Sequence, residues 1–162
     1  MNRRPGSRAR AARLLAAALL LCAGKAAAQS TTLQVVPVQG LSFGNLIPGV
    51  PEQVGVGDGA RRAEVVLQGR GTFDLSLILP AALVAPSGAR IPLRFGTADA
   101  ALASTTSTVP AGFNPRQMYR VRLGEGLGLP RLLLGGTALP AADQPPGRYQ
   151  ATLVLIVTPP GT

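Results

Sequence analysis

The sequence predicts an all-β fold, an antiparallel sandwich or barrel, that follows an N-terminal leader. Short segments of alternating polar and apolar residues recur along the chain, and turns rich in glycine and proline separate them. After the leader, no stretch carries the apolar stripe of an amphipathic helix. The 20 glycines and 15 prolines are interleaved with the apolar segments. They therefore indicate turns and not a disordered tract.

The leader, residues 1–28, has the organisation of a secretory signal peptide. Five arginines form a basic start, residues 14–22 form an apolar run, and three alanines (26–28) suit cleavage before Gln29. The apolar run is too short to cross a bilayer. The alternatives are a retained membrane anchor and a lipoprotein attached through Cys22, although Leu21 stands where lipidation requires a small residue. We expect a single exported domain, residues 29–162, without a membrane span, in the periplasm, at the outer surface or outside the cell.

Removing the leader changes the charge balance. The whole chain has 16 basic and 7 acidic residues and a net charge of +9. Six of the basic residues precede Gln29 and all the acids follow it, so the mature chain keeps ten basic residues and a net charge of +3. This charge is too small, and too poorly supported by aromatic residues, for a nucleic-acid-binding surface.

The first segment of the mature chain, residues 29–40, alternates around Leu33 and Val35. Pro37 removes one backbone donor from this segment, which favours an edge strand or an arm.

Eight shorter segments follow, four of them with the same alternation, and the Gly57-Asp58-Gly59 turn is typical of the links between them. They are residues 53–56, 63–68, 72–79, 83–84, 91–96, 119–123, 131–134 and 137–139. Residues 97–115 are small and polar, so we expect a surface loop there, with one helical turn at 98–103.

The last strand, residues 147–158, has the clearest pattern in the chain. Tyr149, Ala151, Leu153, Leu155 and Val157 share one face. The second half of the strand is apolar on both faces, as in a strand buried in the middle of a structure. We therefore expect this strand to be the spine of the fold.

The mature sequence lacks the residues of common catalytic and metal sites. It contains no His, Cys or Lys, which excludes His- or Cys-dependent nucleophiles, a Ser-Lys pair and the usual zinc ligands. The seven carboxylates form no clustered motif, and turn chemistry explains Asp58 and Asp143. We expect no enzyme, no cofactor and no metal.

Three arginines suggest an alternative function. Arg94, Arg120 and Arg122 fall on the polar faces of two expected strands. If those strands are neighbours, the arginines form a small basic patch, and the protein is a monomeric module that binds an anionic glycan. A solvated outer face explains the same residues.

Several stretches in order resemble one protein family. They are residues 41–46 (LSFGNL), 63–69 (AEVVLQG), 73–80 (FDLSLILP), 133–139 (LLGGTAL) and 146–157 (PGRYQATLVLIV). The chain resembles a bacterial secreted domain of unknown function with an L-x-F-G opening and a G-x-Y-x-x-T last strand. That family is similar to spore coat protein U and to the pilin subunits of chaperone–usher fimbriae.

The resemblance implies an immunoglobulin-like, pilin-like β-sandwich with a structural or adhesive role at the cell surface. It brings no catalytic residues. It implies self-association or association with other surface or pilus subunits, with help from a periplasmic chaperone, by addition of a β-strand. The expected donor arm carries Leu33, Val35, Val36 and Val38. The expected acceptor strand carries Tyr149, Leu153, Leu155 and Val157.

Overall fold

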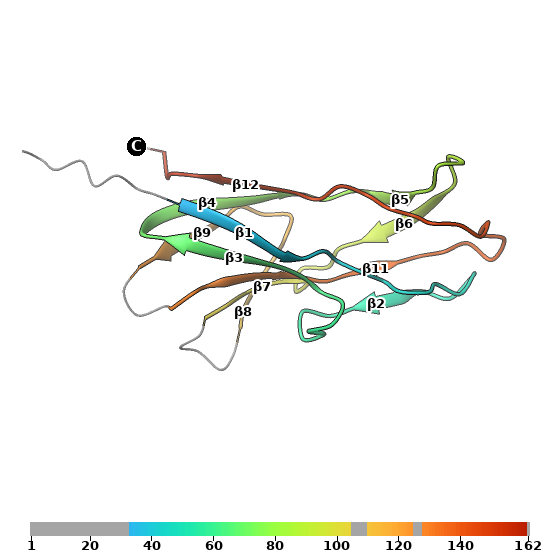
Figure 1. Cartoon of the computed structure of the whole chain (residues 1–162), viewed down its shortest axis with the longest axis horizontal. Helices are drawn as coiled ribbons and strands as arrows, with labels where there is room; N and C mark the ends of the chain where they lie inside the picture. Colours follow the sequence, from blue (N-terminus) through green and yellow to red (C-terminus); the bar gives the residue numbers. More distant parts are fainter. Residues whose placement is uncertain (1–32, 105–109, 125–127, 162) are drawn as a thin grey trace, which may run out of the picture. The chain divides into compact units, whose positions relative to one another are not determined.

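The computed structural model describes residues 33–104, 110–124 and 128–161, and this part of the chain is all-β (Figure 1). Twelve strands form three antiparallel sheets, and the described residues contain no helix, hence none that could span a membrane. The predicted all-β antiparallel class is therefore confirmed. The expected signal peptide, residues 1–28, lies outside the described residues.

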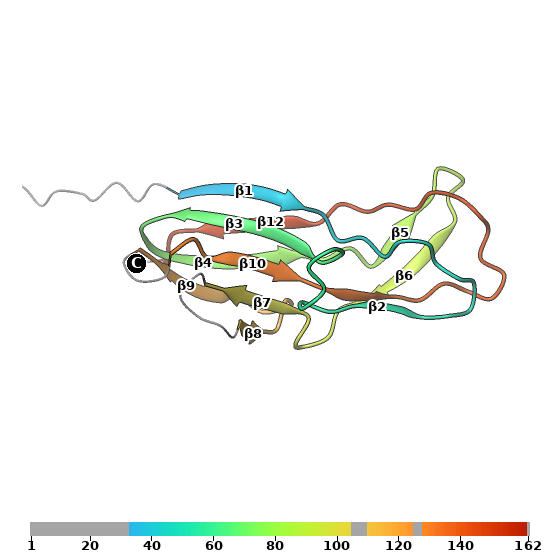
Figure 2. The same cartoon turned by 60° about the horizontal axis from the view of Figure 1, so that its bottom comes forward.

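The largest sheet has five strands in the order β1-β3-β10-β7-β8, which lie side by side in Figure 2. Their bounds are Leu33–Gln39 (β1), Ala63–Gly69 (β3), Arg131–Leu134 (β10), Ala100–Ala103 (β7) and Ala111–Phe113 (β8). Of the two structures expected for residues 29–40, the described part, β1, is an edge strand, because it pairs with β3 alone, with a register shift between Pro37 and Gln39.

The two smaller sheets have the orders β12-β4-β9 and β2-β11-β6-β5. The bounds of the first are Val154–Thr158 (β12), Gly71–Ile78 (β4) and Tyr119–Leu123 (β9). The bounds of the second are Glu52–Val54 (β2), Gly136–Ala138 (β11), Arg90–Arg94 (β6) and Ala82–Val84 (β5).

The five-stranded and three-stranded sheets face each other across an apolar core, as in a β-sandwich. Leu67 of β3, Leu75 of β4 and Val121 of β9 are buried in one cluster. Leu33 of β1 and Leu155 of β12 pack against it and are only partly buried. The two strands that carry these partly buried residues are both at the ends of their sheets.

One long strand links two sheets. β10 pairs with β3 and β7, and after Gly135 the chain continues as β11, which pairs with β2 and β6. The Gly135 N–H donates to the Asp99 carbonyl (2.8 Å). A side chain at Gly135 would stand 2.2 Å from the Val54 carbonyl oxygen. The crossing therefore requires a glycine at this position.

The prediction of a loop with a helical turn in residues 97–115 is wrong. The structure has β7 and β8 in this stretch, and residues 105–109 lie outside the described part. Ala100 and Ala101 are buried, because small side chains let β7 pack closely beside β10 and the core. The small, polar and alanine-rich composition of residues 97–115 predicts a loop instead.

The prediction that the last strand is buried in the middle of the fold is also wrong. Only Val154–Thr158 forms β12, which is the end strand of its sheet, and Gln150 makes an isolated bridge to Val84. Val154 and Ile156 are each 41% exposed. Both faces of the strand are apolar, but only the face with Leu155 and Val157 packs against the core.

Candidate functional site

The first and last strands leave one side of the sandwich open. β1 is hydrogen-bonded only to β3 within the described residues, and β12 only to β4. Each strand therefore has a row of backbone donors and acceptors with no strand beside it. In Figures 1 and 2 the two strands run near each other.

A groove of about 690 Å³ lies between them. Val35 and Val38 line one wall, Leu153 and Leu155 line the other, and Phe95 belongs to the lining. None of the residues that line the groove is charged. The groove is therefore suited to apolar side chains.

The exposure of Val35 shows that the groove opens the core to solvent. Val35 lies opposite Leu67 in the ladder, so the two side chains are on the same face of the sheet. Leu67 is fully buried, but Val35 is 40% exposed. An added strand at this side would cover a residue that faces the core and now contacts water.

A second cavity, about 940 Å³, continues the groove towards the beginning of the last strand and is more polar. The two cavities share Leu41, Phe43, Leu83 and Ala151 as lining residues.

Tyr149 fixes one wall of this second cavity. Its hydroxyl donates to the Pro145 carbonyl (2.6 Å) and accepts from the Gln144 Nε2 (2.7 Å). These bonds hold the turn that precedes the last strand.

Three of the four predicted acceptor residues line this continuous groove. Leu153 and Leu155 line the apolar half, and Tyr149 lines the polar half. Val157 instead packs against the core cluster that contains Leu67.

The predicted donor arm lies in the wall of the groove and does not fill it. Val35 and Val38 line the groove, Leu33 packs against the core cluster, and Val36 is paired with Val66 of β3. The arm therefore completes the five-stranded sheet of its own domain and leaves the free edge of β12 without a strand.

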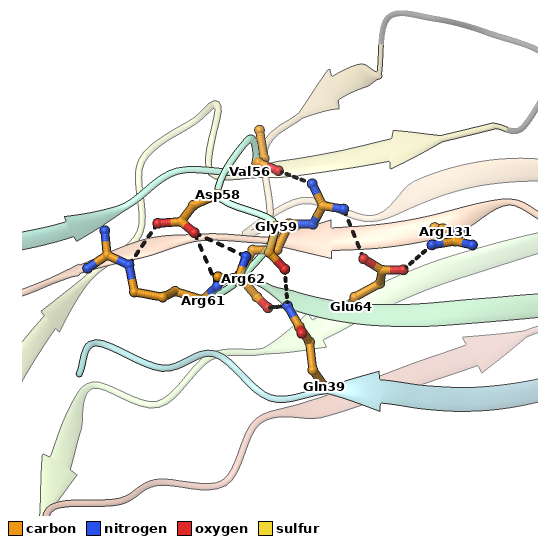
Figure 3. Close-up of polar contacts among 9 residues, drawn as sticks. Gln39, Val56, Asp58, Gly59, Arg61, Arg62, Glu64 and Arg131 are labelled. Atoms are coloured by element: carbon orange, nitrogen blue, oxygen red, sulfur yellow. Dashed lines mark hydrogen bonds and ion pairs between the residues drawn. The ribbon is translucent and has the colours of Figure 1, made fainter.

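A polar cluster holds the end of β1 (Figure 3). The Gln39 Nε2 donates to the carbonyls of Gly59 (2.9 Å) and Arg62 (2.6 Å). Asp58 Oδ1 accepts from the backbone N–H groups of Ala60 and Arg61 (3.2 Å each), so the turn role predicted for Asp58 is confirmed. The cluster ties the C-terminal end of β1 to the loop before β3.

Glu64 is the buried acid of this cluster, with 5% of its surface exposed. It accepts from Arg62 Nη2 (2.9 Å) and from Arg131 Nη1 (2.7 Å). The hydrogen bond from Arg62, helped by Arg131 and opposed by burial, holds the pKa of Glu64 below its ordinary value. Sequence reasoning missed this cluster. The signal was the Arg62-x-Glu64 spacing at the start of an expected strand, because residues two apart lie on one face of extended backbone.

The three arginines of the predicted basic patch do not lie on neighbouring strands. Arg94 is on β6, and Arg120 and Arg122 are on β9, which belongs to another sheet. Arg120 instead donates to both carboxylate oxygens of Asp74 (2.7 and 2.9 Å). It thereby holds the pKa of Asp74 below its ordinary range. The glycan-binding alternative loses the patch on which it depended.

Within residues 33–104, 110–124 and 128–161, no group of three or more His, Cys, Asp or Glu could hold a metal ion. No protein-family model matches the chain, and neither the curated proteins nor the solved structures contain a match.

Proposed function

We propose that the protein is an exported structural or adhesive surface protein, a fimbria-like subunit that assembles by β-strand addition. In this proposal the sandwich is of the immunoglobulin-like, pilin-like kind, and another chain supplies a strand at the open side. The observation that carries the proposal is the uncharged groove between β1 and the last strand, in which the core-facing Val35 is 40% exposed.

Two features of the groove support an extended peptide as the occupant. Two edge strands, β1 and β12, contribute to its walls, and their free edges offer main-chain hydrogen bonds. Its lining is apolar at the level of Leu153 and Leu155, so alternate side chains of an added strand would be buried there. Other surface subunits, a chaperone or a second copy are all chains that could supply such a strand.

The test uses the mature chain and two synthetic peptides, which copy residues 29–40 and 150–158. We expect one of them to bind and to slow hydrogen exchange of the amides of β12. Leu155→Arg, which places a charge in the groove, abolishes the binding. Ile78→Arg is the matched control, because Ile78 is exposed, lines neither cavity and lies on β4, away from the free edge, so the groove stays open to the peptide. If neither peptide binds the unaltered chain, the proposal is wrong.

Export is a separate part of the proposal. Mass spectrometry of the protein recovered from outside the cytoplasm is expected to find Gln29 as the first residue. A first residue before the basic start of the leader would contradict cleavage.

A further inference from the structure

The free edge of β12 lacks the features that usually prevent strands from pairing. Edge strands in natural proteins commonly carry a charge, a proline or a bulge. The five residues of β12 are uncharged, and their pairing with β4 shows no register shift. The prolines, Pro159 and Pro160, come only after the strand ends. The edge is therefore open to another strand of equal length.

The side chains of β12 are also apolar on the face away from the core. Val154 and Ile156 are each 41% exposed there, and Ile78 of β4, which lies opposite Val154, is 57% exposed. Apolar β-branched residues on an outer face are costly to leave in water. They stabilise a sheet when they contact one another across paired strands.

We propose that β12 pairs in antiparallel orientation with β12 of a second copy of this chain, about a two-fold axis at Ile156. The inference rests on the proposed function and names the strand that is added. The N-terminal arm is the less suitable donor, because β1 is already paired with β3 and Gln39 fixes its end to Gly59 and Arg62.

The alternation of side chains fixes the register. Opposite residues of an antiparallel pair lie on the same face of the sheet, so the two-fold axis must pass through a residue and not between two residues. An axis at Ile156 is the one that uses all five residues of β12. It places Ile156 beside its own copy, Val154 beside Thr158 of the other copy, and Leu155 beside Val157 on the core side.

The surroundings of the strand fit a second copy of the same chain. The groove that opens beside β12 has no charged lining residue, so two copies would meet without like charges between them. Val35 and Val38, which are exposed on the wall of this groove, lie on the side that the second copy approaches. The contact uses the same surface on both copies, so by itself it closes as a dimer, and a longer fimbria-like assembly requires a further contact elsewhere on the chain.

Cysteine cross-linking tests both the pairing and its register. The mature chain has no cysteine of its own. Ile156→Cys is expected to form a disulfide-linked dimer under mild oxidation, because the residue faces its own copy. Val154→Cys alone does not cross-link, but a mixture of Val154→Cys and Thr158→Cys does. Ile78→Cys is the control: it is exposed on the same face but lies on β4, away from the edge.

Sedimentation of the full mature chain provides a second measurement. Ile156→Lys places two like charges at the axis and is expected to raise the dissociation constant of the dimer by about tenfold or more. Ile78→Lys leaves it nearly unchanged. A chain that is monomeric at every concentration, or equal cross-linking at positions 78 and 156, overturns the inference. If a peptide still protects the amides of β12 in that case, strand addition is retained and only the pairing of β12 with a second copy is contradicted. If no peptide binds either, both proposals are wrong.

Discussion

Gly135 and Gly136 occupy the place where one strand passes from the five-stranded to the four-stranded sheet. A methyl group at Gly135 would stand 2.2 Å from the Val54 carbonyl oxygen, and one at Gly136 would stand 2.9 Å from Phe95 Cε1. The first contact is with backbone, which cannot turn away. The second is with a ring that is itself buried.

Gly135→Ala is therefore expected to reduce the free energy of unfolding by about 1–3 kcal/mol or more, since the strands at the crossing must separate. Urea denaturation measures the loss. Gly40→Ala is the control, because a methyl group there meets nothing within 4 Å. An equal loss in both variants would contradict the close approach.

Glu64 gives a pH-dependent prediction. Its folded pKa lies below the ordinary value of 4.5, so the ionised form is stabilised in the fold. Its contribution to stability is complete above that value and is lost as the pH falls through the lower folded pKa. Glu64→Gln is therefore expected to destabilise the protein more at about pH 7 than at about pH 3.

Urea denaturation at the two pH values measures this difference. The control is Asp143→Asn, an exposed acid that has no ion pair among the described residues. It should change stability little at either pH. A Glu64→Gln effect that is independent of pH would contradict the role of the ionised carboxylate.

Among the elements, the turn before the last strand depends on Tyr149. Tyr149→Phe removes the bonds to Pro145 and Gln144 and is expected to cost about 1 kcal/mol. It should also speed hydrogen exchange of the Gln150 amide, which donates to the Val84 carbonyl. Tyr119→Phe is the control, because its hydroxyl bonds to no described residue while its ring stacks on Phe113. Equal effects of the two substitutions would contradict the anchoring role.

Most strands could be predicted because alternation is a local property of the sequence. Residues 72–79 alternate clearly, and β4 is found there. β7 could not be predicted, because Ala100 and Ala101 have no strand preference of their own and are buried only by contact with β10. The resemblance implies the acceptor role of Leu153 and Leu155, and alternation predicts only that the two residues share one face. Alternation does not predict that β12 lies at the edge of its sheet, because this position depends on pairing between distant segments of the chain.

On the scale of the whole molecule, the strand through Gly135 joins the sheets into one unit. Leu75 belongs to the core cluster between the five-stranded and three-stranded sheets, and Ile91 belongs to the cluster with Phe43 and Val54. Leu75→Ala and Ile91→Ala are each expected to cost about 2–5 kcal/mol and to lower the midpoint of one shared transition.

Circular dichroism and tyrosine fluorescence, followed during the same denaturation, measure whether the transitions coincide. Val84→Ala, at an exposed position, serves as the control and should leave the midpoint nearly unchanged. Two separate transitions in the Ile91→Ala variant would show that the four-stranded sheet unfolds by itself.

The pairing of β12 with β4 also has a consequence for the time course of folding. β4 occupies the middle of the chain, and its partner is the final strand of the described residues. Contacts between such distant segments form slowly, because the long loop between them loses conformational entropy on closing before the contacts can stabilise the fold. Until then the edge of β4, with Leu75 and Leu77, has no partner in its own chain. The interval before the last strand arrives is thus when this protein is most open to pairing with any other chain.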